Sequence, residues 1–305
     1  MAASPKHRDH GGSAMSVRMF RRGDRDQLTD LVNGHAAAVV PGVSASVNTV
    51  VTSMERRPEE FVTDPWVGER VTLVAEEYGR IAAAAHLLCY RTDREVGEEL
   101  RGTGAVEWFL FRPGAEEPAG TLMTACLAHL ERRRVRARYA GGELPVPGVC
   151  GVPDQWPHIR AAYERAGFRH TGHVEIVLLA RVADLPAPSG VHPEEIRRTV
   201  GGIGTLLTAH RDGDPVGHLE LDTTLDRPER RSRAGGIADI CDLDATDDTV
   251  LDRLLGHGRD WLEQCGADRL LAYTTPDEAD ETERLLRRGF RELTRTARGW
   301  EHRPA

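Results

Sequence analysis

The chain has 305 residues, which is long enough for two ordinary domains that each bury a core of their own. Its 40 Lys and Arg residues against 48 Asp and Glu residues give a formal net charge of -8, which argues against nucleic acid as a partner, because phosphate backbones are bound by clustered basic residues. The five cysteines are widely spaced and form no C-x-x-C pair, so we expect reduced thiols in a cytoplasmic protein and no metal site. The longest apolar run, 81–90, is too short to span a bilayer, and we expect no membrane partner.

The first predicted elements lie before residue 60. Residues 1–14 form a polar tail without an apolar signal segment, and we expect this tail to be disordered. An apolar strand is predicted at 17–20. An amphipathic helix follows, from Asp24 at its N-cap to Ala37, and a second helix is predicted at 46–57.

The next stretch predicts a hairpin and then a strand, a loop and a helix. Two β-type runs at 71–76 and 81–90 are separated by a turn that contains glycine. A short apolar strand at 105–111 leads into a loop rich in small residues at 112–120. Apolar residues at helical spacing from Leu122 onward predict a helix after this loop. Small residues between a strand and a helix leave N–H groups exposed at the helix N-terminus, where a phosphate can bind.

The first half closes with a strand at 135–140, a loop rich in Gly and Pro at 141–155, a helix at 156–166 and a strand at 174–182. Gly167 follows the helix, as is common at helix C-termini. A linker rich in Pro and Ala begins at Asp184.

Beyond the linker the order of elements repeats. The hairpin glycines Gly79 and Gly213 are separated by 213 − 79 = 134 residues, and Tyr139 and Tyr273 by the same offset. Gly167-Phe168 returns as Gly289-Phe290, at an offset of 122. Near-constant offsets over several elements indicate a tandem duplication.

The hairpin, the strand, loop and helix, and the segment Tyr163-Glu-Arg-Ala-Gly-Phe168 together resemble the GNAT superfamily of acyl-CoA N-acyltransferases. The resemblance covers both halves, and it implies an α/β (α+β) fold class with two GNAT-like domains, each a mixed, mostly antiparallel twisted sheet flanked by helices. The expected organisation is a disordered tail at 1–14, an N-terminal GNAT-like domain at 15–183, a linker at 184–193 and a degenerate C-terminal GNAT-like domain at 194–305.

The same resemblance implies the chemistry. An acetyl or other short acyl group would pass from acyl-CoA to a primary amine of a small molecule, by direct attack in a ternary complex and without a metal. The tyrosine four residues before the Gly-Phe pair, here Tyr163, commonly protonates the leaving thiolate in this family. Its spacing alone favours a core residue on the apolar face of its helix, and the resemblance favours the catalytic role.

Glu107 lies between Val106 and Trp108 on the strand that precedes the loop. If it faces the acceptor it can take the proton of the amine; otherwise it points to solvent or pairs with an arginine. Backbone N–H groups at the strand end are predicted to stabilise the oxyanion, and those of the loop to bind the pyrophosphate of CoA. The residues concerned are Leu110, Phe111 and Arg112 for the oxyanion, and Gly114, Ala119, Gly120 and Thr121 for the pyrophosphate.

The extra loop and the start of the following helix are well placed to line an acceptor site. We expect Asp154, Trp156 and His158 there, with Trp108 beside Glu107, although Asp154 also suits the N-cap of the helix.

The loops of both halves depart from the family pattern, in which Arg or Gln is followed by spaced glycines. Pro118, which has no N–H, stands at the first glycine place. The second half has Asp244, Asp247 and Asp248 in its loop and Leu285 at the place of Tyr163. We therefore expect chemistry in the first half only, and a non-catalytic GNAT-like protein that binds a ligand or partner is the alternative. The sequence leaves the oligomeric state open, and a homodimer is one option.

Overall fold

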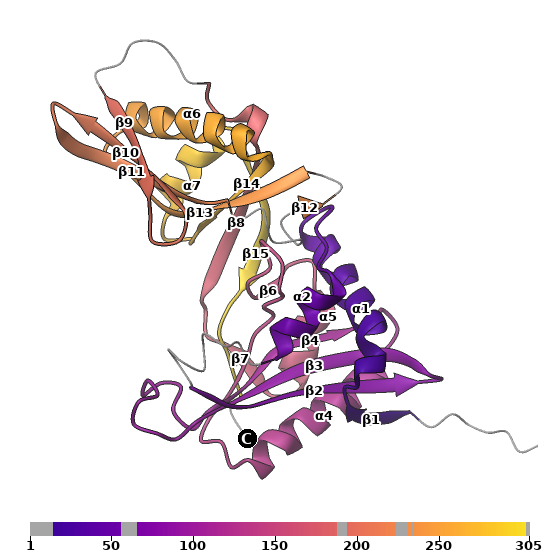
Figure 1. Cartoon of the computed structure of the whole chain (residues 1–305). Coiled ribbons are helices and arrows are strands. Elements are labelled where there is room, and N and C mark those ends of the chain that lie inside the picture. Colours follow the sequence, from indigo (N-terminus) through magenta and orange to yellow (C-terminus); the bar gives the residue numbers. More distant parts are fainter. Residues whose placement is uncertain (1–14, 56–65, 188–193, 224–230, 233–234, 303–305) are drawn as a thin grey trace, which may run out of the picture.

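The computed structural model describes residues 15–55, 66–187, 194–223, 231–232 and 235–302 (Figure 1). The predicted tail at 1–14 and most of the linker lie outside these ranges. The described chain forms two β-sheets, one of seven strands in the order β1-β2-β3-β4-β5-β16-β7, the other of nine strands in the order β6-β15-β8-β14-β13-β11-β10-β9 with β12 beside β13. The fold class of two mixed sheets flanked by helices is as predicted.

The first sheet consists of β1 (Ser16–Met19), β2 (Val67–Glu77), β3 (Arg80–Tyr90), β4 (Gly104–Phe111), β5 (Arg138–Ala140), β16 (Trp300–His302) and β7 (Phe168–His170). The second sheet consists of β6 (Val152–Pro153), β15 (Phe290–Ala297), β8 (Val174–Arg181), β14 (Ala267–Thr274), β13 (Gly235–Ala245), β12 (Arg231–Ser232), β11 (Asp214–Asp222), β10 (Thr205–Arg211) and β9 (Glu195–Val200). The α-helices are α1 (Arg25–Val39), α2 (Val47–Met54), α4 (Glu116–Arg132), α5 (Pro157–Arg165), α6 (Asp248–Cys265) and α7 (Ala279–Leu286).

Helices α1 and α2 lie on one side of the first sheet and α4 on the other (Figure 1). Helix α6 packs on the second sheet through a stripe of leucines at helical spacing. Leu251, Leu254, Leu255 and Leu262 are each at most 2% exposed. Among the described residues of the second half, no helix corresponds to α1 and α2.

The two hairpins show the internal repeat at the level of backbone geometry. Tyr78 and Gly79 have φ angles of 51° and 75°, and Asp212 and Gly213 have φ angles of 55° and 94°. Positive φ at both central residues is typical of the type I′ turn, whose twist matches that of the flanking strands. The turns therefore support a duplicated unit.

Each half gives its last strand to the other half's sheet. Strand β8, expected to close the first half, instead pairs with β14 and β15 in the second sheet. Strand β16, from the end of the chain, pairs with β5 and β7 in the first sheet. The sheets thus cross the predicted boundary at 184–193.

Several element ends also differ from the sequence prediction. The loop predicted at 112–120 ends at Ala115, because α4 begins at Glu116. Asp24 does occupy the N-cap of α1, but its carboxylate makes no capping bond with that helix. It instead accepts hydrogen bonds from Arg18, at 2.6 Å and 2.8 Å.

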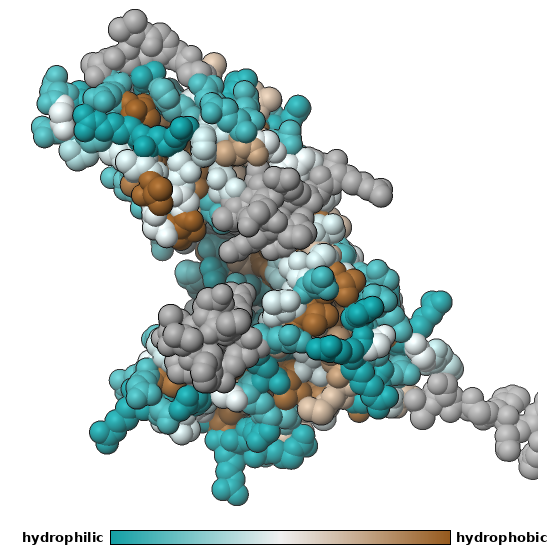
Figure 2. Space-filling model, viewed as in Figure 1, coloured by the Kyte–Doolittle hydropathy of each residue, from teal (hydrophilic) through white to brown (hydrophobic). Residues whose placement is uncertain are grey.

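The visible surface is mostly hydrophilic, with small separate apolar areas (Figure 2). Among the residues that the structure describes, the exposed large apolar side chains are Met19, Tyr78, Val200, Ile203 and Leu286. Within the described ranges, every helix is too short or too polar to cross a membrane.

Candidate functional site

Strand β4 contains a β-bulge at Glu107. In the ladder between β3 and β4, His86 pairs with Trp108 and Leu87 pairs with Val106, so Glu107 has no opposite residue. A bulge bends the strand and redirects a side chain, and bulges are common next to functional sites. Here the redirected side chain is a carboxylate.

Strands β4 and β5 separate at the same point. Their parallel ladder ends at the pair Val106 and Ala140, and the N–H of Gly141 donates to the carbonyl of Val106 at 2.9 Å. Strand β4 then continues to Phe111 without β5 beside it. The separation leaves one edge of β4 without a neighbouring strand as far as Phe111.

A partly open cavity of about 140 Å³ lies where the two strands separate. Glu107, which is half-buried, lines it together with the loop after β5 and the connection between β15 and β16. The second half therefore supplies part of the wall of a cavity in the first half. The lining residues are Glu107, Gly141, Gly142, Glu143, Cys150, Gly151, Arg298 and Gly299.

Two residues that line this cavity, Cys150 and Arg298, are both hydrogen-bonded to the carboxylate of Glu175. The thiol of Cys150 donates to Oε2 of Glu175 at 2.6 Å, and Nη1 of Arg298 donates to Oε1 of the same carboxylate at 3.1 Å. Burial, and next the hydrogen bond to Glu175, raises the pKa of the Cys150 thiol. The thiol therefore stays protonated near neutral pH, which argues against a nucleophilic role.

Sequence reasoning did not identify Glu143, Cys150, Glu175 or Arg298 as site residues. Glu175 and Arg298 are 123 positions apart, and the strand exchange brings them together. A local signal did exist for Glu143 and Cys150, because both lie on the Gly-rich loop that the first half has and the second half does not.

Tyr163 is fully buried, and its hydroxyl donates to the carbonyl of Gly141, a cavity residue, at 2.7 Å. Its ring packs against Phe168 and Trp300, with centroids 5.4 Å and 5.7 Å away. Burial raises the pKa of Tyr163 well above its usual value of 10.0. Tyr163 is thus a core residue whose protonated hydroxyl is bonded to a residue that lines the cavity.

Helix α4 places three of the predicted pyrophosphate donors differently from the sequence prediction. The N–H of Ala119 donates to the carbonyl of Ala115 at 3.0 Å, so it already has a partner. The two residues that follow lie inside the helix, where N–H groups bond to carbonyls four residues earlier. The prediction that Ala119, Gly120 and Thr121 offer free N–H groups to a pyrophosphate is therefore wrong.

The N-terminus of α4 presents a mixed environment to an anion. Arg112 and Gly114 are exposed just before the helix, and Gly114 has a φ of 83°. Glu116 and Glu117 occupy the first turn, and Pro118 has no N–H to donate. Two carboxylates in the first turn weaken anion binding there.

The predicted oxyanion donors divide into two sets. The N–H of Arg112 donates to the carbonyl of Ala82 at 2.9 Å and is not available. Because alternate N–H groups of a strand point the same way, the N–H of Leu110 also faces β3. The N–H of Phe111 faces the opposite edge, where β5 has diverged, and is the donor that geometry leaves.

Two predicted acceptor residues lie away from the cavity. Trp108 is 3% exposed and stacks on His86 with ring centroids 5.8 Å apart, so it is a core residue. Asp154 is exposed and pairs with Arg160 at 3.1 Å. It is not the N-cap of α5, since Trp156 holds that position.

The other two predicted acceptor residues, Trp156 and His158, lie near the end of β4. Trp156 is 1% exposed, and its Nε1 donates to the carbonyl of His35 at 3.1 Å. Nε2 of His35 lies 3.3 Å from Nε2 of His158, whose ring packs on Phe111 with centroids 4.8 Å apart. Burial lowers the pKa of His35 to about 4, and it also lowers the pKa of His158. Neither Trp156 nor His158 lines the cavity.

Comparison with known proteins identifies the architecture. Neither a protein-family model nor a curated protein matches the chain. Among solved structures, a tandem GNAT protein from the clavulanic acid biosynthesis pathway, solved without AcCoA, aligns over 96% of this chain and 100% of its own, with a TM-score of 0.62 and 13% identity. The chain has the tandem GNAT fold.

Two further structures agree with this assignment. A GCN5-related N-acetyltransferase from Sphaerobacter thermophilus aligns over 95% of this chain and 96% of its own, with a TM-score of 0.60 and 14% identity. A glucosamine N-acetyltransferase region of a fungal multi-domain GH3 beta-N-acetylglucosaminidase aligns with a TM-score of 0.57 and 14% identity. The alignment covers 96% of this chain and 38% of the fungal chain.

The second GNAT unit keeps the backbone features of the first with different side chains. The ladder between β11 and β13 passes from Glu220 opposite Asp242 to Leu221 opposite Ile240, so Cys241 is the bulged residue. Cys241 lies 241 − 107 = 134 residues after Glu107, the offset of the repeat. The second unit therefore has a thiol at the place of the carboxylate. Cys241 is exposed, and partial desolvation together with the nearby carboxylates of Asp222 and Asp239 raises the pKa of its thiol to about 11.

The place of Tyr163 is also altered in the second GNAT unit. Leu285 is 1% exposed and belongs to the second core. An aliphatic side chain supplies packing and no proton.

The helix N-terminus of the second unit is occupied by carboxylates of the chain itself. Asp247 caps α6 by accepting from the N–H of Val250 at 2.9 Å, and it also pairs with Arg211 at 3.1 Å. A pyrophosphate at this helix terminus would have to displace the cap.

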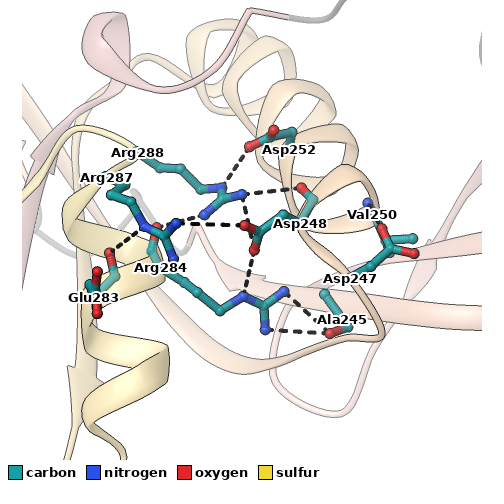
Figure 3. Close-up of polar contacts among 9 residues, drawn as sticks. All are labelled: Ala245, Asp247, Asp248, Val250, Asp252, Glu283, Arg284, Arg287 and Arg288. Atoms are coloured by element: carbon teal, nitrogen blue, oxygen red, sulfur yellow. Dashed lines mark hydrogen bonds and ion pairs between the residues drawn. The ribbon is translucent and has the colours of Figure 1, made fainter.

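Asp248 stands at the centre of an arginine cluster (Figure 3). Its carboxylate lies 2.9 Å from Nε of Arg284, 3.3 Å from Nη2 of Arg288 and 3.9 Å from Nη1 of Arg287. Arg288 also donates to Asp252 at 2.6 Å. These contacts tie the end of α7 to the start of α6 and fill the space between them, so they favour a structural second unit.

Proposed function

We propose that the first GNAT unit is an N-acyltransferase that moves an acetyl or other short acyl group from acyl-CoA to a primary amine of a small molecule. The observation that carries this proposal is the placement of Glu107 at the β4 bulge, where β4 leaves β5 and a cavity opens. The edge of β4 that β5 no longer pairs with suits the acyl-CoA arm, and the cavity suits the amine.

In the proposed reaction the amine nitrogen attacks the thioester carbonyl carbon. A C–N bond forms, the C–S bond breaks, and the proton of the attacking nitrogen passes to Glu107. Tyr163 gives its proton to the departing thiolate, and the N–H of Phe111 stabilises the oxyanion. A positioned acid or base contributes about 10²-fold to 10⁴-fold in rate.

The second GNAT unit completes the site in this proposal without taking part in the chemistry. Arg298 and Gly299 line the cavity, while Cys241 and Leu285 stand where the base and the acid would be. We also place the protein in the cytoplasm, supported by five cysteines that are all free thiols.

One observation favours a second candidate function, a non-catalytic GNAT-like protein that binds a ligand or partner. The first turns of α4 and α6 both carry acidic side chains, Glu116 and Glu117 in one case and Asp248 in the other. Negative charge at a helix N-terminus opposes the binding of a pyrophosphate.

Acetyl-CoA binding separates the two candidates. A ligand at 100 times its dissociation constant stabilises a protein by about 2.7 kcal/mol, so millimolar acetyl-CoA should raise the melting temperature. Glu107→Gln should then lower the rate of CoA thiol release with a primary amine by about 10²-fold or more, and leave acetyl-CoA binding nearly unchanged. The matched control is Glu292→Gln, an exposed residue outside the cavity that pairs with Arg295. Absence of any acetyl-CoA stabilisation would favour the non-catalytic candidate.

A further inference from the structure

Three side chains with metal-binding atoms meet between helix α4 and the first sheet. They are Glu69 on β2, Cys89 on β3 and His129 on α4, and their ligand atoms all lie within 4.8 Å of one another. Glu69 and Cys89 are directly opposite each other in the ladder between β2 and β3, so their side chains share one face of the sheet. Helix α4 packs on these two strands (Figure 1). Within the described ranges, no other three His, Cys, Asp or Glu side chains lie as close together.

The distance between two of these ligand atoms suits a shared ion. Nε2 of His129 lies 3.3 Å from Oε2 of Glu69, which is long for a hydrogen bond between nitrogen and oxygen. Zinc binds nitrogen at about 2.0 to 2.1 Å and oxygen at about 2.0 to 2.2 Å, so two such ligands at tetrahedral angles lie about 3.3 to 3.5 Å apart. The two atoms therefore already have the separation that one zinc ion requires.

Arg133 fixes the orientation of the Glu69 carboxylate. Its Nη2 binds Oε1, while His129, one helical turn earlier, faces Oε2. Carboxylates that bind metals are in turn hydrogen-bonded by neighbouring groups, and Arg133 is such a group. The positive charge of Arg133 opposes a cation, but its side chain is 53% exposed and solvent screens the charge.

The chemistry of the three ligands points to zinc. Thiolate and imidazole ligands favour zinc over magnesium and calcium, which prefer oxygen, and a carboxylate does not suit the soft ion Cu(I). Cys89 is 9% exposed, whereas the side chains of His129 and Glu69 are 13% and 26% exposed. An ion can therefore reach the group from the side of Glu69, and water can take the fourth position.

We propose that Glu69, Cys89 and His129 bind a zinc ion, which links the C-terminal part of α4 to strands β2 and β3. Without the ion, burial and next the charge of Glu69 raise the pKa of Cys89 to about 11, so the thiol stays protonated near neutral pH. When zinc binds, a Zn–S bond forms and the thiol proton passes to solvent. The charges of the Glu69 carboxylate and the Cys89 thiolate then balance that of the ion.

The zinc site is separate from the proposed acyl-transfer site. His129 follows Glu116, the first residue of α4, by 129 − 116 = 13 positions, which is about 20 Å along a helix axis. The absence of a C-x-x-C pair argued against a metal site in the sequence. Ligands that lie 89 − 69 = 20 and 129 − 89 = 40 positions apart leave no such spacing, because the fold alone brings them together.

Zinc titration of the full chain, freed of metal with a chelator and dialysed, tests the proposal. Competition with a coloured chelator should show one tightly bound Zn²⁺ per chain. Glu69→Gln, His129→Gln and Cys89→Ser should each weaken binding by about 100-fold or more, because loss of an outer partner alone costs about 10-fold to 100-fold. The matched controls Cys241→Ser and His173→Gln change an exposed thiol and an exposed imidazole and should bind zinc as the parent does. A parent that binds no zinc, or ligand variants that bind it like the parent, would overturn the proposal.

Co²⁺ in place of zinc reports whether Cys89 is a ligand. A thiol that coordinates a metal is deprotonated, and a cobalt thiolate absorbs strongly in the near ultraviolet. This absorption band should appear in the parent and in Cys241→Ser, and it should be absent in Cys89→Ser. A band that depends on Cys241 instead would assign metal binding to the exposed thiol and overturn the proposal.

Thermal unfolding tests the link between α4 and the two strands. Zn²⁺ should raise the melting temperature of the parent and leave those of Glu69→Gln and His129→Gln unchanged, while Mg²⁺ and Ca²⁺ at the same concentration should have no effect. Both variants are conservative changes of partly exposed side chains, so the metal-free proteins should share one far-UV circular dichroism spectrum. Equal stabilisation of the parent and His129→Gln by zinc would mean that the ion binds elsewhere.

Discussion

The indole of Trp300 packs on the phenol ring of Tyr163 with ring centroids 5.7 Å apart, and both side chains are at most 1% exposed. Trp300 belongs to the last strand of the chain, which lies between β5 and β7 of the first sheet. The residue proposed as the acid of the first unit is therefore held in place by the second. Each unit depends on a strand of the other for its complete sheet.

Trp300→Ala should destabilise the whole chain by about 3 to 5 kcal/mol, the usual cost of removing a large buried aromatic side chain. Chemical unfolding monitored by far-UV circular dichroism measures this change. Trp261→Ala, a partly buried residue of the second core, is the control and should cost less.

A chain that ends after Leu185 should aggregate, because β8 then has no sheet to join. A soluble truncated chain with an unchanged melting temperature would contradict the dependence between units.

Glu116→Gln should raise the affinity for acetyl-CoA by about 2-fold to 5-fold. A single charge near a helix N-terminus contributes about 0.3 to 1 kcal/mol, and the change removes one that opposes the pyrophosphate. Titration calorimetry at low and at high salt measures the effect, which should shrink at high salt. Glu131→Gln, near the other end of α4, is the control. Equal affinity in Glu116→Gln and the parent would place the pyrophosphate elsewhere.

Local patterns predicted those elements whose cause is local. The turns at Tyr78-Gly79 and Asp212-Gly213 follow from backbone conformations that glycine adopts without strain. The early start of α4 was also readable, since Glu116, Glu117 and Pro118 are all residue types that favour a first helical turn. The sequence prediction gave more weight to the small residues that follow them.

The strand exchange had no local signal. A strand records its exposed and buried faces in its sequence, but not which of two similar sheets it joins. Strands β8 and β16 have ordinary patterns, and their exchange brings Glu175 and Arg298 together at the cavity. The sequence named Glu107 as a candidate from its residue type and its place on the strand, and the fold places it at the cavity; Arg298 could be identified only from the fold.

Asp248→Asn should convert the arginine cluster of the second unit into an anion site. Arg284, Arg287 and Arg288 then lose the carboxylate that they share (Figure 3). Inorganic phosphate should raise the melting temperature of this variant more than that of the parent. Asp260→Asn, on the same helix, is the control. An identical response to phosphate in parent and variant would mean that Asp248 does not occupy an anion position.

Stability should fall as the pH drops from 6.5 toward 4, and His35 should account for part of the loss. Burial lowers its pKa from 6.5 to about 4, so the unfolded chain binds more protons in this range and unfolding becomes easier as the pH falls. The contribution of His35 should be about 2 kcal/mol between pH 7 and pH 5. Urea unfolding at both values measures it: His35→Gln should show a smaller pH dependence than the parent, and the exposed His173→Gln should not. Equal pH dependence in parent and His35→Gln would contradict this account.

Tyr163→Phe separates the catalytic role of the hydroxyl from its structural one. The variant keeps the ring and its packing against Phe168 and Trp300, and it removes only the hydrogen bond to the carbonyl of Gly141. Leaving that carbonyl unpaired should cost about 1 to 3 kcal/mol of stability, because a buried acceptor loses its donor.

Turnover at saturating acetyl-CoA should fall by about 10²-fold in Tyr163→Phe if the phenol protonates the thiolate, with the affinity for acetyl-CoA much less affected. Because burial raises the pKa of Tyr163 well above its ordinary value, the phenol stays protonated through neutral pH, and the parent should show no loss of rate from its ionisation below about pH 10. The control is Leu285→Met in the second unit, which alters packing at the equivalent position and should leave the rate unchanged. Melting temperature and thiol release are measured on the same proteins. A variant that loses stability yet turns over as fast as the parent would assign Tyr163 to the core and require another proton source for the departing thiolate.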